Sequence, residues 1–170
     1  MNAFFGKFRG VCTDNQDPLQ VGRIRARVPD VTDDDETGWA MPCFPAGDQG
    51  MGVFALPKVG AGVWIEFEHG NPDYPICSGG WFSNLSELPP ALLIPPMLQD
   101  DKILLKTAGG TSLMLDDTLG TGCIILETAT DQKITLGVTG IEIDNGQGAK
   151  ITLGPGPLIN VNNGALASAA

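Results

Sequence analysis

The feature that most constrains this chain is a series of short, closely spaced strand patterns between residues 102 and 168. Within each pattern apolar and polar residues alternate, and glycine, aspartate or asparagine separates one pattern from the next. Such alternation is typical of β-strands with one buried face, because successive side chains of a strand point to opposite sides. The strands expected from it cover residues 102–107, 112–117, 123–129, 133–138, 140–144, 149–154, 158–162 and 165–168.

The alternation assigns branched aliphatic side chains to one common, inward-facing side of these strands. That set consists of Leu113, Leu115, Ile124, Leu126, Ile134, Leu136, Ile141, Ile143, Ile151, Leu153, Ile159 and Val161. The other side carries polar residues, among them Thr135, Glu142, Thr152 and Asn160. We expect the first set to form a hydrophobic core and the second to face solvent.

A single copy of this segment is too small to bury its own apolar side. Each expected strand contributes only two or three inward side chains, and Trp81 and Phe82 are the last aromatic residues of the chain. A lone meander would expose an apolar stripe and open strand edges, which promote uncontrolled pairing. We therefore predict an intertwined homotrimer, a triple-stranded β-helix over residues 102–170 with the aliphatic set as its core. A self-contained solenoid or a small β-sandwich is the alternative.

Residues 1–84 have a less regular pattern that indicates a small closed barrel. Hardly any window shows apolar residues at helical spacing, and turns rich in Asn, Asp, Pro and Gly separate the apolar runs. Five or six strands in a segment of this length favour a barrel of the OB type, and the whole chain is predicted to be all-β. The strand candidates lie at residues 4–12, 20–28, 39–44, 52–56, 62–67 and 76–82.

Residues 85–101 are expected to link the two parts. They contain two Pro-Pro pairs, which favour an extended, polyproline-like path. Their aliphatic residues suggest that the linker runs along another surface. The chain beyond it contains no proline between Met97 and Gly154, so the change in composition marks the boundary between the two parts.

The charge and the cysteines exclude several classes of protein. The chain has 20 acidic and 10 basic residues, and its net charge of -10 disfavours binding to a phosphate backbone. Its four cysteines form no CxxC pair, so we do not expect a zinc ribbon. We expect the cysteines to be reduced thiols. No secretory signal pattern and no run of membrane-spanning length is visible. We expect synthesis in a bacterial cytoplasm without a signal peptide.

Several long phrases resemble the central spike family of phage baseplates, which includes type VI secretion spikes and the spikes of extracellular contractile injection systems. The resemblance covers nearly the whole chain. In the expected barrel it rests on FFGKFRG (4–10), DPLQVGRIRARVPDV (17–31), WAMPCFPAG (39–47) and GVFALPKVGAGVWIEFEHGNPDYPICSGGWF (52–82). In the strand repeats it rests on KTAGGTSLMLDD (106–117) and ILETATDQKITLGVTGIEIDNG (125–146).

The resemblance implies a mechanical function in a virion tail baseplate or an extracellular injection particle. The barrel would contact the baseplate hub protein, the β-helix would point at the target membrane, and contraction would drive it through. A PAAR-like tip protein often caps the blunt end in this family. Two family features are missing: residues 83–101 leave no room for a lysozyme-like domain, and the single histidine, His69, excludes a His-x-His metal tip.

Candidate sites for chemistry are weak. Carboxylates flank the single histidine, but a surface turn is the simpler interpretation, and Cys77 lacks the features that activate a thiol. The acidic run 33–36 lacks the ligand spacing of a calcium loop, and Asp116 and Asp117 end a strand. We therefore predict no catalytic residue, no cofactor and no metal. The carboxylates around His69 are Glu66, Glu68 and Asp73.

Two other functions remain open from the sequence. An OB-type barrel with a basic face could be a binding module for nucleic acid or glycan, although we expect few aromatic residues around the arginines of that face. We expect these arginines instead to pair with acids of a neighbouring subunit or the hub. A glycan-cleaving spike could use a carboxylate pair such as Glu127 and Asp131, although no long loop offers a substrate cleft. The basic residues are Lys7, Arg9, Arg23, Arg25 and Arg27.

Overall fold

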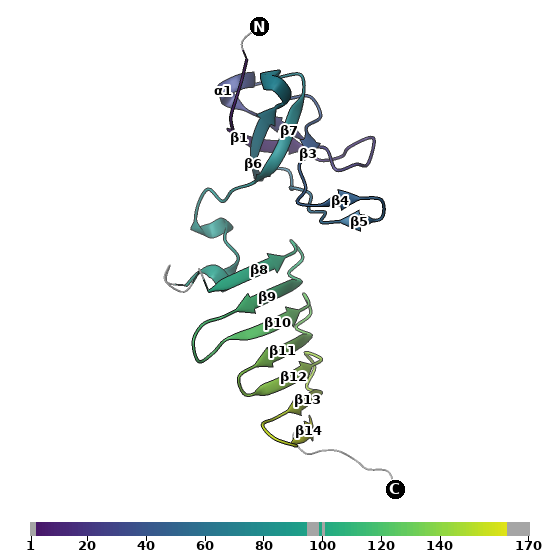
Figure 1. Cartoon of the computed structure of the whole chain (residues 1–170), viewed down its shortest axis with the longest axis vertical. Helices are drawn as coiled ribbons and strands as arrows, with labels where there is room; N and C mark the ends of the chain where they lie inside the picture. The colour runs from purple at the N-terminus through teal and green to yellow at the C-terminus, as the bar shows by residue number, and fades with distance from the viewer. Residues whose placement is uncertain (1–2, 95–98, 100, 163–170) are drawn as a thin grey trace. The chain divides into compact units, whose positions relative to one another are not determined.

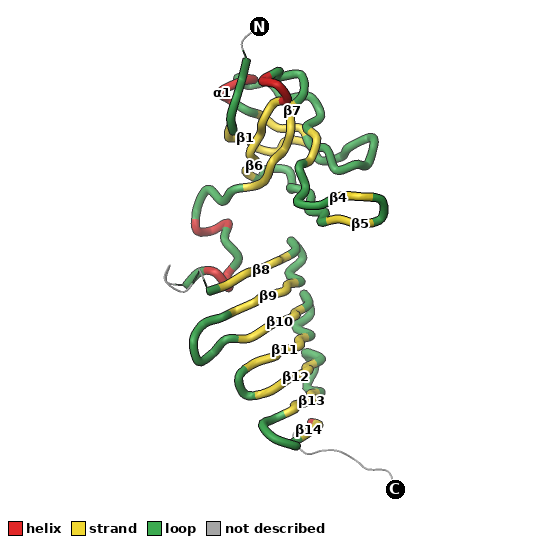
Figure 2. Tube along the Cα trace, viewed as in Figure 1, coloured by secondary structure: helices red, strands yellow, loops and turns green. Residues whose placement is uncertain are grey.

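The computed structural model describes residues 3–94, 99 and 101–162, and the chain divides into two compact units, Met1–Glu87 and Leu88–Ala170. Both units are built from β-strands with only short helical turns (Figures 1 and 2), which confirms the predicted all-β class. The division falls inside the segment expected to be a linker. None of the helices in the described residues is long and apolar enough to cross a membrane.

The first unit is a small barrel. Its sheet has the strand order β2-β1-β6-β7-β3, and single bridges from Ile24 to Ala40 and from Arg27 to Glu36 join the β2 edge to the segment before β3. These bridges close the sheet on itself, as expected for an OB-type barrel. Its strands are β1 (Phe8–Asp14), β2 (Arg25–Arg27), β3 (Met41–Pro42), β6 (Gly62–Phe67) and β7 (Pro75–Gly80).

The barrel encloses one hydrophobic core. Alternate residues of β6 point into it, and Phe4, Phe8 and Val31 pack against its margin. Gly10 lies where β1 passes close to its neighbours, since a Cβ there would come within 3.2 Å of the Arg27 carbonyl oxygen. The buried core residues are Cys12, Ile24, Ala26, Val28, Ala40, Val63, Ile65, Phe67 and Cys77.

Parts of the barrel differ from the sequence prediction. The strand expected over residues 20–28 is reduced to β2, because residues 17–23 form a loop around the Asp17 carboxylate. The prediction of a strand over residues 52–56 is wrong. Residues 53–56 have no strand structure, and only Gly52 takes part in a short hairpin. That hairpin pairs β4 (Gly47–Asp48) with β5 (Met51–Gly52).

Four short helical turns complete the described chain. The linker was expected to be extended, but it begins with two 3-10 turns, because Glu87 accepts the Ser83 backbone N–H at 2.7 Å and Pro90 starts the second turn. This part of the linker prediction is therefore wrong. The turns are α1 (Pro29–Thr32), η1 (Glu68–Gly70), η2 (Leu85–Glu87) and η3 (Pro90–Leu92).

The second unit is a seven-stranded antiparallel meander in which each strand pairs with the next in sequence. The strands follow the sequence prediction to within one or two residues at their ends. The strand expected at residues 165–168 lies outside the described residues. The strands are β8 (Lys102–Lys106), β9 (Ser112–Asp116), β10 (Cys123–Glu127), β11 (Lys133–Gly137), β12 (Gly140–Asp144), β13 (Lys150–Leu153) and β14 (Ile159–Val161).

Candidate trimer interface and barrel surface

One face of the meander carries two columns of aliphatic side chains, here called the apolar face. Directly paired residues in an antiparallel sheet point to the same side, so the register places all twelve predicted core residues on this face. The first column is Leu105, Leu113, Leu126, Ile134, Ile143, Ile151 and Val161. The second column is Ile103, Leu115, Ile124, Leu136, Ile141, Leu153 and Ile159.

Sequence reasoning missed two members of these columns, Ile103 and Leu105. Both lie on β8, where Leu104 between them is also apolar. With three apolar residues in a row, the alternation cannot say which side of the strand is the apolar one. Only the pairing of Ile103 with Leu115 and of Leu105 with Leu113 places them on the apolar face.

The apolar face is uncovered in the single chain. Twelve of the fourteen column residues expose between 36% and 65% of their surface, whereas the aliphatic residues of the barrel core expose at most 1%. Full burial of one aliphatic side chain is worth about 1.5–3 kcal/mol. An uncovered apolar face of this extent on a soluble protein marks an interaction surface.

The opposite face of the meander carries a ladder of alternating charges. Glu127 pairs with Lys133, Lys133 with Asp144, and Asp144 with Lys150 on successive strands. The Lys150 ammonium lies 3.2 Å from Asp144 and 2.8 Å from Glu142. The Gly146 backbone N–H and Lys150 lower the pKa of Asp144, and Glu142 and Asp144 raise the pKa of Lys150. Opposite charges in register therefore favour the observed pairing.

The middle column of this second face changes character along the meander. It begins with three apolar residues, Leu104, Met114 and Ile125, on β8, β9 and β10. It continues with the residues predicted to face outward, Thr135, Glu142, Thr152 and Asn160. Beside its apolar end, Lys102 pairs with Asp116, and this contact together with Thr118 lowers the pKa of Asp116 to about 2.

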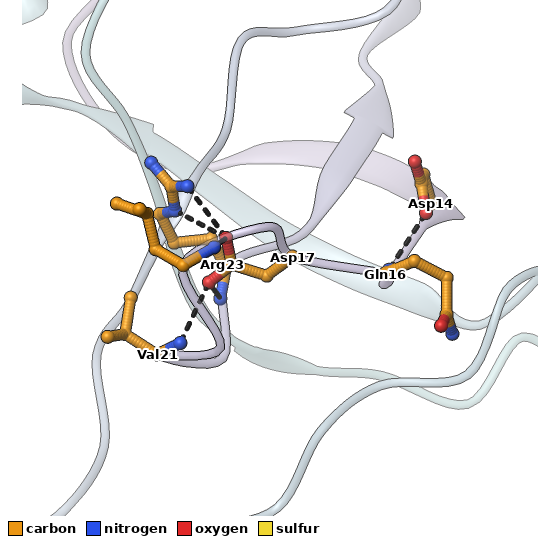
Figure 3. Close-up of polar contacts among 6 residues, drawn as sticks. Asp14, Gln16, Asp17, Val21 and Arg23 are labelled. Carbon is orange, nitrogen blue, oxygen red and sulfur yellow. Dashed lines mark hydrogen bonds and ion pairs between the residues drawn. The ribbon is translucent and has the colours of Figure 1, made fainter.

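In the barrel, a buried carboxylate organises the loop before β2 (Figure 3). Asp17 accepts backbone N–H groups from Leu19 at 3.0 Å, Val21 at 2.9 Å and Arg23 at 3.2 Å. The Arg23 guanidinium donates to the same carboxylate at 2.7 and 2.9 Å. These contacts, the guanidinium first, hold the pKa of Asp17 well below its usual range. Asp17 has its hydrogen-bonding capacity filled within the chain, so its role is structural.

Tryptophan side chains lie against the arginines of the barrel surface. The guanidinium groups of Arg23 and Arg25 lie 5.6 and 5.2 Å from the Trp39 ring centroid. Arg9 lies 5.8 Å from the Trp64 centroid and 5.3 Å from that of Trp81. The expectation of few aromatic residues around these arginines is wrong, because the fold brings Trp39, Trp64 and Trp81 next to them.

The expectation that these arginines pair with acids of another subunit is also wrong for two of them. Arg23 pairs with Asp17 at 2.7 Å, and Arg25 pairs with Glu36 at 3.4 Å, both within the chain. These intrachain pairs offset much of the positive charge on this strand. The surface therefore has stacking platforms, and the charges of two of its arginines are offset within the chain.

The weaker chemical candidates do not assemble into a site. His69 occupies a left-handed turn with φ of 53°. Burial raises the pKa of the Cys77 thiol, which is the opposite of what an activated nucleophile requires. Glu127 lies in the charge ladder opposite Lys133. Among the residues that the structure describes, no group of three or more His, Cys, Asp and Glu side chains is placed to hold a metal ion.

Comparison with known protein families matches both units. Residues 8–82 match the type VI secretion system/phage-baseplate injector OB domain. Residues 102–167 match the phage baseplate V C-terminal trimerisation domain, which takes in all seven strands of the meander. The chain belongs to the phage-baseplate V family. A search of the curated proteins found no match.

Membership of this family assigns the chain a structural role in the baseplate spike rather than an enzymatic one. The family's setting is the virion or injection particle. The trimerisation domain supports a homotrimer as the assembled state. The predicted fold class and family are thereby confirmed, and the residues that lie uncovered on the meander are those a trimer could bury.

Proposed function

We propose that three copies of this chain form the piercing spike of a contractile injection machine, with the apolar face of each meander turned toward a common axis as an intertwined β-helix. The observation that carries the proposal is the apolar face itself, with fourteen aliphatic side chains in two unbroken columns over seven strands. Each column residue would meet the columns of the other two copies.

Such an assembly suits a mechanical task. The strands of the meander hydrogen-bond to one another, and the close packing of a filled core gives the interior low compressibility. The charged face would lie outside, where net negative charge keeps the particle soluble. We propose that the barrel end joins the baseplate hub protein, that the opposite end meets the target membrane, and that a PAAR-like tip protein caps it.

The assembly can be tested by light scattering on the full chain. We expect a mass of three times the 17.8 kDa chain. A paired substitution, Ile134→Asp with Ile143→Asp, places two charges on the apolar face and should give monomers or aggregates. The control, Thr135→Asp, introduces a charge on the opposite face of the same strand and should remain trimeric. A wild-type monomer would contradict the proposal.

The piercing function needs a separate experiment. Particles assembled with wild-type chain or with the Ile134→Asp/Ile143→Asp variant would be applied to target cells, and entry of a membrane-impermeant dye would be measured. We expect dye entry with the wild type and the Thr135→Asp control only. Equal dye entry from particles that carry the non-trimeric variant would show that the spike does not pierce.

Binding of single-stranded nucleic acid by the barrel is a second candidate, favoured by the Arg9 guanidinium that lies against Trp64 and Trp81. Such Arg and aromatic surfaces stack with bases. The net charge of -10 opposes it. Micromolar binding of an oligonucleotide at physiological salt, lost in Arg9→Ala, would establish this function, and we expect no binding.

A further inference from the structure

The turns of the meander lie on two opposite edges of the sheet (Figure 1). The two edges differ in amino-acid composition. Turns 117–122, 138–139 and 154–158 lie on one edge, here called the aliphatic edge. Each carries one strongly exposed aliphatic residue: Leu119 at 98%, Val138 at 70% and Leu158 at 58%. The turns of the other edge, here called the polar edge, are 107–111, 128–132 and 145–149, and they contain only small and polar residues.

The aliphatic edge adjoins the second column. Leu119 and Val138 line one groove together with members of that column. The polar edge bears a separate groove, lined by the first-column residues Leu126, Ile134 and Ile143 and by charged residues, Glu127, Lys133 and Asp144. Exposed aliphatic side chains therefore continue past the second column at one edge and end at the first column at the other. The second-column residues in the aliphatic-edge groove are Ile103, Leu115, Ile124 and Leu136.

Leu119 is held in its exposed position by its own loop. The Thr121 N–H donates to the Thr118 carbonyl oxygen at 3.1 Å, and the Thr118 hydroxyl donates to Asp116 at 2.5 Å. Gly120 follows with φ of +83°, a conformation that favours glycine. With 98% of its surface exposed, the Leu119 side chain packs against almost nothing within the single chain, although its turn is ordered.

A cyclic trimer requires a directional seam between neighbours. In three-fold symmetry each copy meets the next through two different surfaces, unlike the self-matching interface of a two-fold dimer. The two edges of the meander provide one aliphatic and one polar surface. The match to the trimerisation domain covers both edges of the meander. A second copy of this chain is therefore the partner that we expect to bind there.

We propose that Leu119, Val138 and Leu158 of each copy pack onto the first column beside the polar edge of the next copy. This inference rests on the homotrimer proposed above and adds to it the direction of the seam and the residues that close it. The uncovered first-column groove supplies the apolar contact, and the small residues of the polar-edge turns allow close approach.

The test measures whether Leu119 is covered in the assembled protein. In a background of Cys43→Ser and Cys123→Ser, the variant Leu119→Cys would be treated with a maleimide, and the rate compared with that of Val59→Cys. Val59 is a matched control, 60% exposed on the barrel. In the native trimer we expect the cysteine at position 119 to react on the order of 100-fold more slowly than the cysteine at position 59, because labelling at position 119 then requires local opening. Both variants should react equally when unfolded.

A second variant tests the contribution of the edge to assembly. Replacing Leu119, Val138 and Leu158 together by serine should raise the trimer dissociation constant. We expect an increase of about tenfold to a hundredfold for each aliphatic side chain removed from a seam. Replacing Val53, Val59 and Leu85 by serine removes three exposed aliphatic side chains from the first unit and should leave the dissociation constant unchanged.

The outcomes separate this inference from the proposed function. A trimeric protein whose position 119 reacts as fast as position 59, or whose serine variant dissociates like the wild type, would overturn the seam and leave the trimer intact. A wild-type protein that is monomeric by light scattering would overturn the trimer and the seam together. Protection at position 119 within a trimer supports both.

Discussion

Replacing Gly140 by alanine is expected to disrupt the meander at the start of β12. Gly140 has φ of +131°, and a Cβ built there would lie 1.9 Å from the Leu153 carbonyl oxygen on the neighbouring strand. Ordinary Cβ contacts begin near 3.4 Å, so the backbone of one strand must move by more than 1 Å. The backbone strain costs about 1–3 kcal/mol and each ladder hydrogen bond lost with it about 1 kcal/mol.

The same pair of strands offers a matched control. Gly137 is the direct partner of Gly140 in the β11–β12 ladder. A Cβ on Gly137 would meet only side-chain atoms, at 3.8 Å and beyond, which is ordinary contact. Gly137→Ala should therefore be neutral, or stabilising by about 0.4–1 kcal/mol through the unfolded state. The expected difference between the two variants is about 3–5 kcal/mol per chain.

Guanidinium unfolding followed by two signals would measure this difference. All three tryptophans lie in the barrel unit, so their fluorescence reports on the barrel, whereas far-ultraviolet circular dichroism includes the meander. We expect Gly140→Ala to lower the circular dichroism midpoint and the yield of trimer while the fluorescence midpoint stays unchanged. If Gly140→Ala and Gly137→Ala unfold at the same midpoint, the close approach of Gly140 to Leu153 is not a constraint on the fold.

Three further predictions concern charge and thiols. The pKa of Asp116 is about 2 in the folded protein, below its ordinary value of 3.8, so its contribution to stability is present above pH 4 and is lost as the pH falls from about 4 to 2. Asp116→Asn should flatten that part of the stability profile, and an unchanged slope would contradict this reasoning. Lys133→Glu faces Glu127 and Asp144 and should destabilise the meander by about 0.2–1 kcal/mol per contact, less so at high salt, whereas Lys133→Arg should not. Cys43 should react with a thiol reagent well before Cys12 and Cys77, whose pKa burial raises; simultaneous reaction of all three would argue against the barrel core.

Much of the meander could be predicted from the sequence, because a pleated strand turns alternate side chains to opposite faces regardless of its surroundings. The twelve aliphatic residues assigned to one side do share one face. The alternation failed at Ile103 and Leu105, where Leu104 removes the contrast between the two sides. That these columns form the trimer core stays a prediction.

The barrel was harder to predict, because its local structure depends on polar contacts that hydropathy does not record. The strand over residues 62–67 was predicted with its observed bounds, since Val63, Ile65 and Phe67 alternate with more polar neighbours. The strand over 20–28 was too long, because the Asp17 carboxylate takes the N–H groups of Val21 and Arg23 that a ladder would otherwise use.

The sequence by itself determined the all-β class, the two-part organisation and the aliphatic residues of the meander, since composition, turn residues and a period of two are local properties. Tertiary structure decided which strands pair and in what register. Only that register stacks Glu127, Lys133, Asp144 and Lys150 into a ladder and brings Gly140 against the Leu153 carbonyl. Contacts between strands depend on the path of the whole chain, so no local pattern contains them.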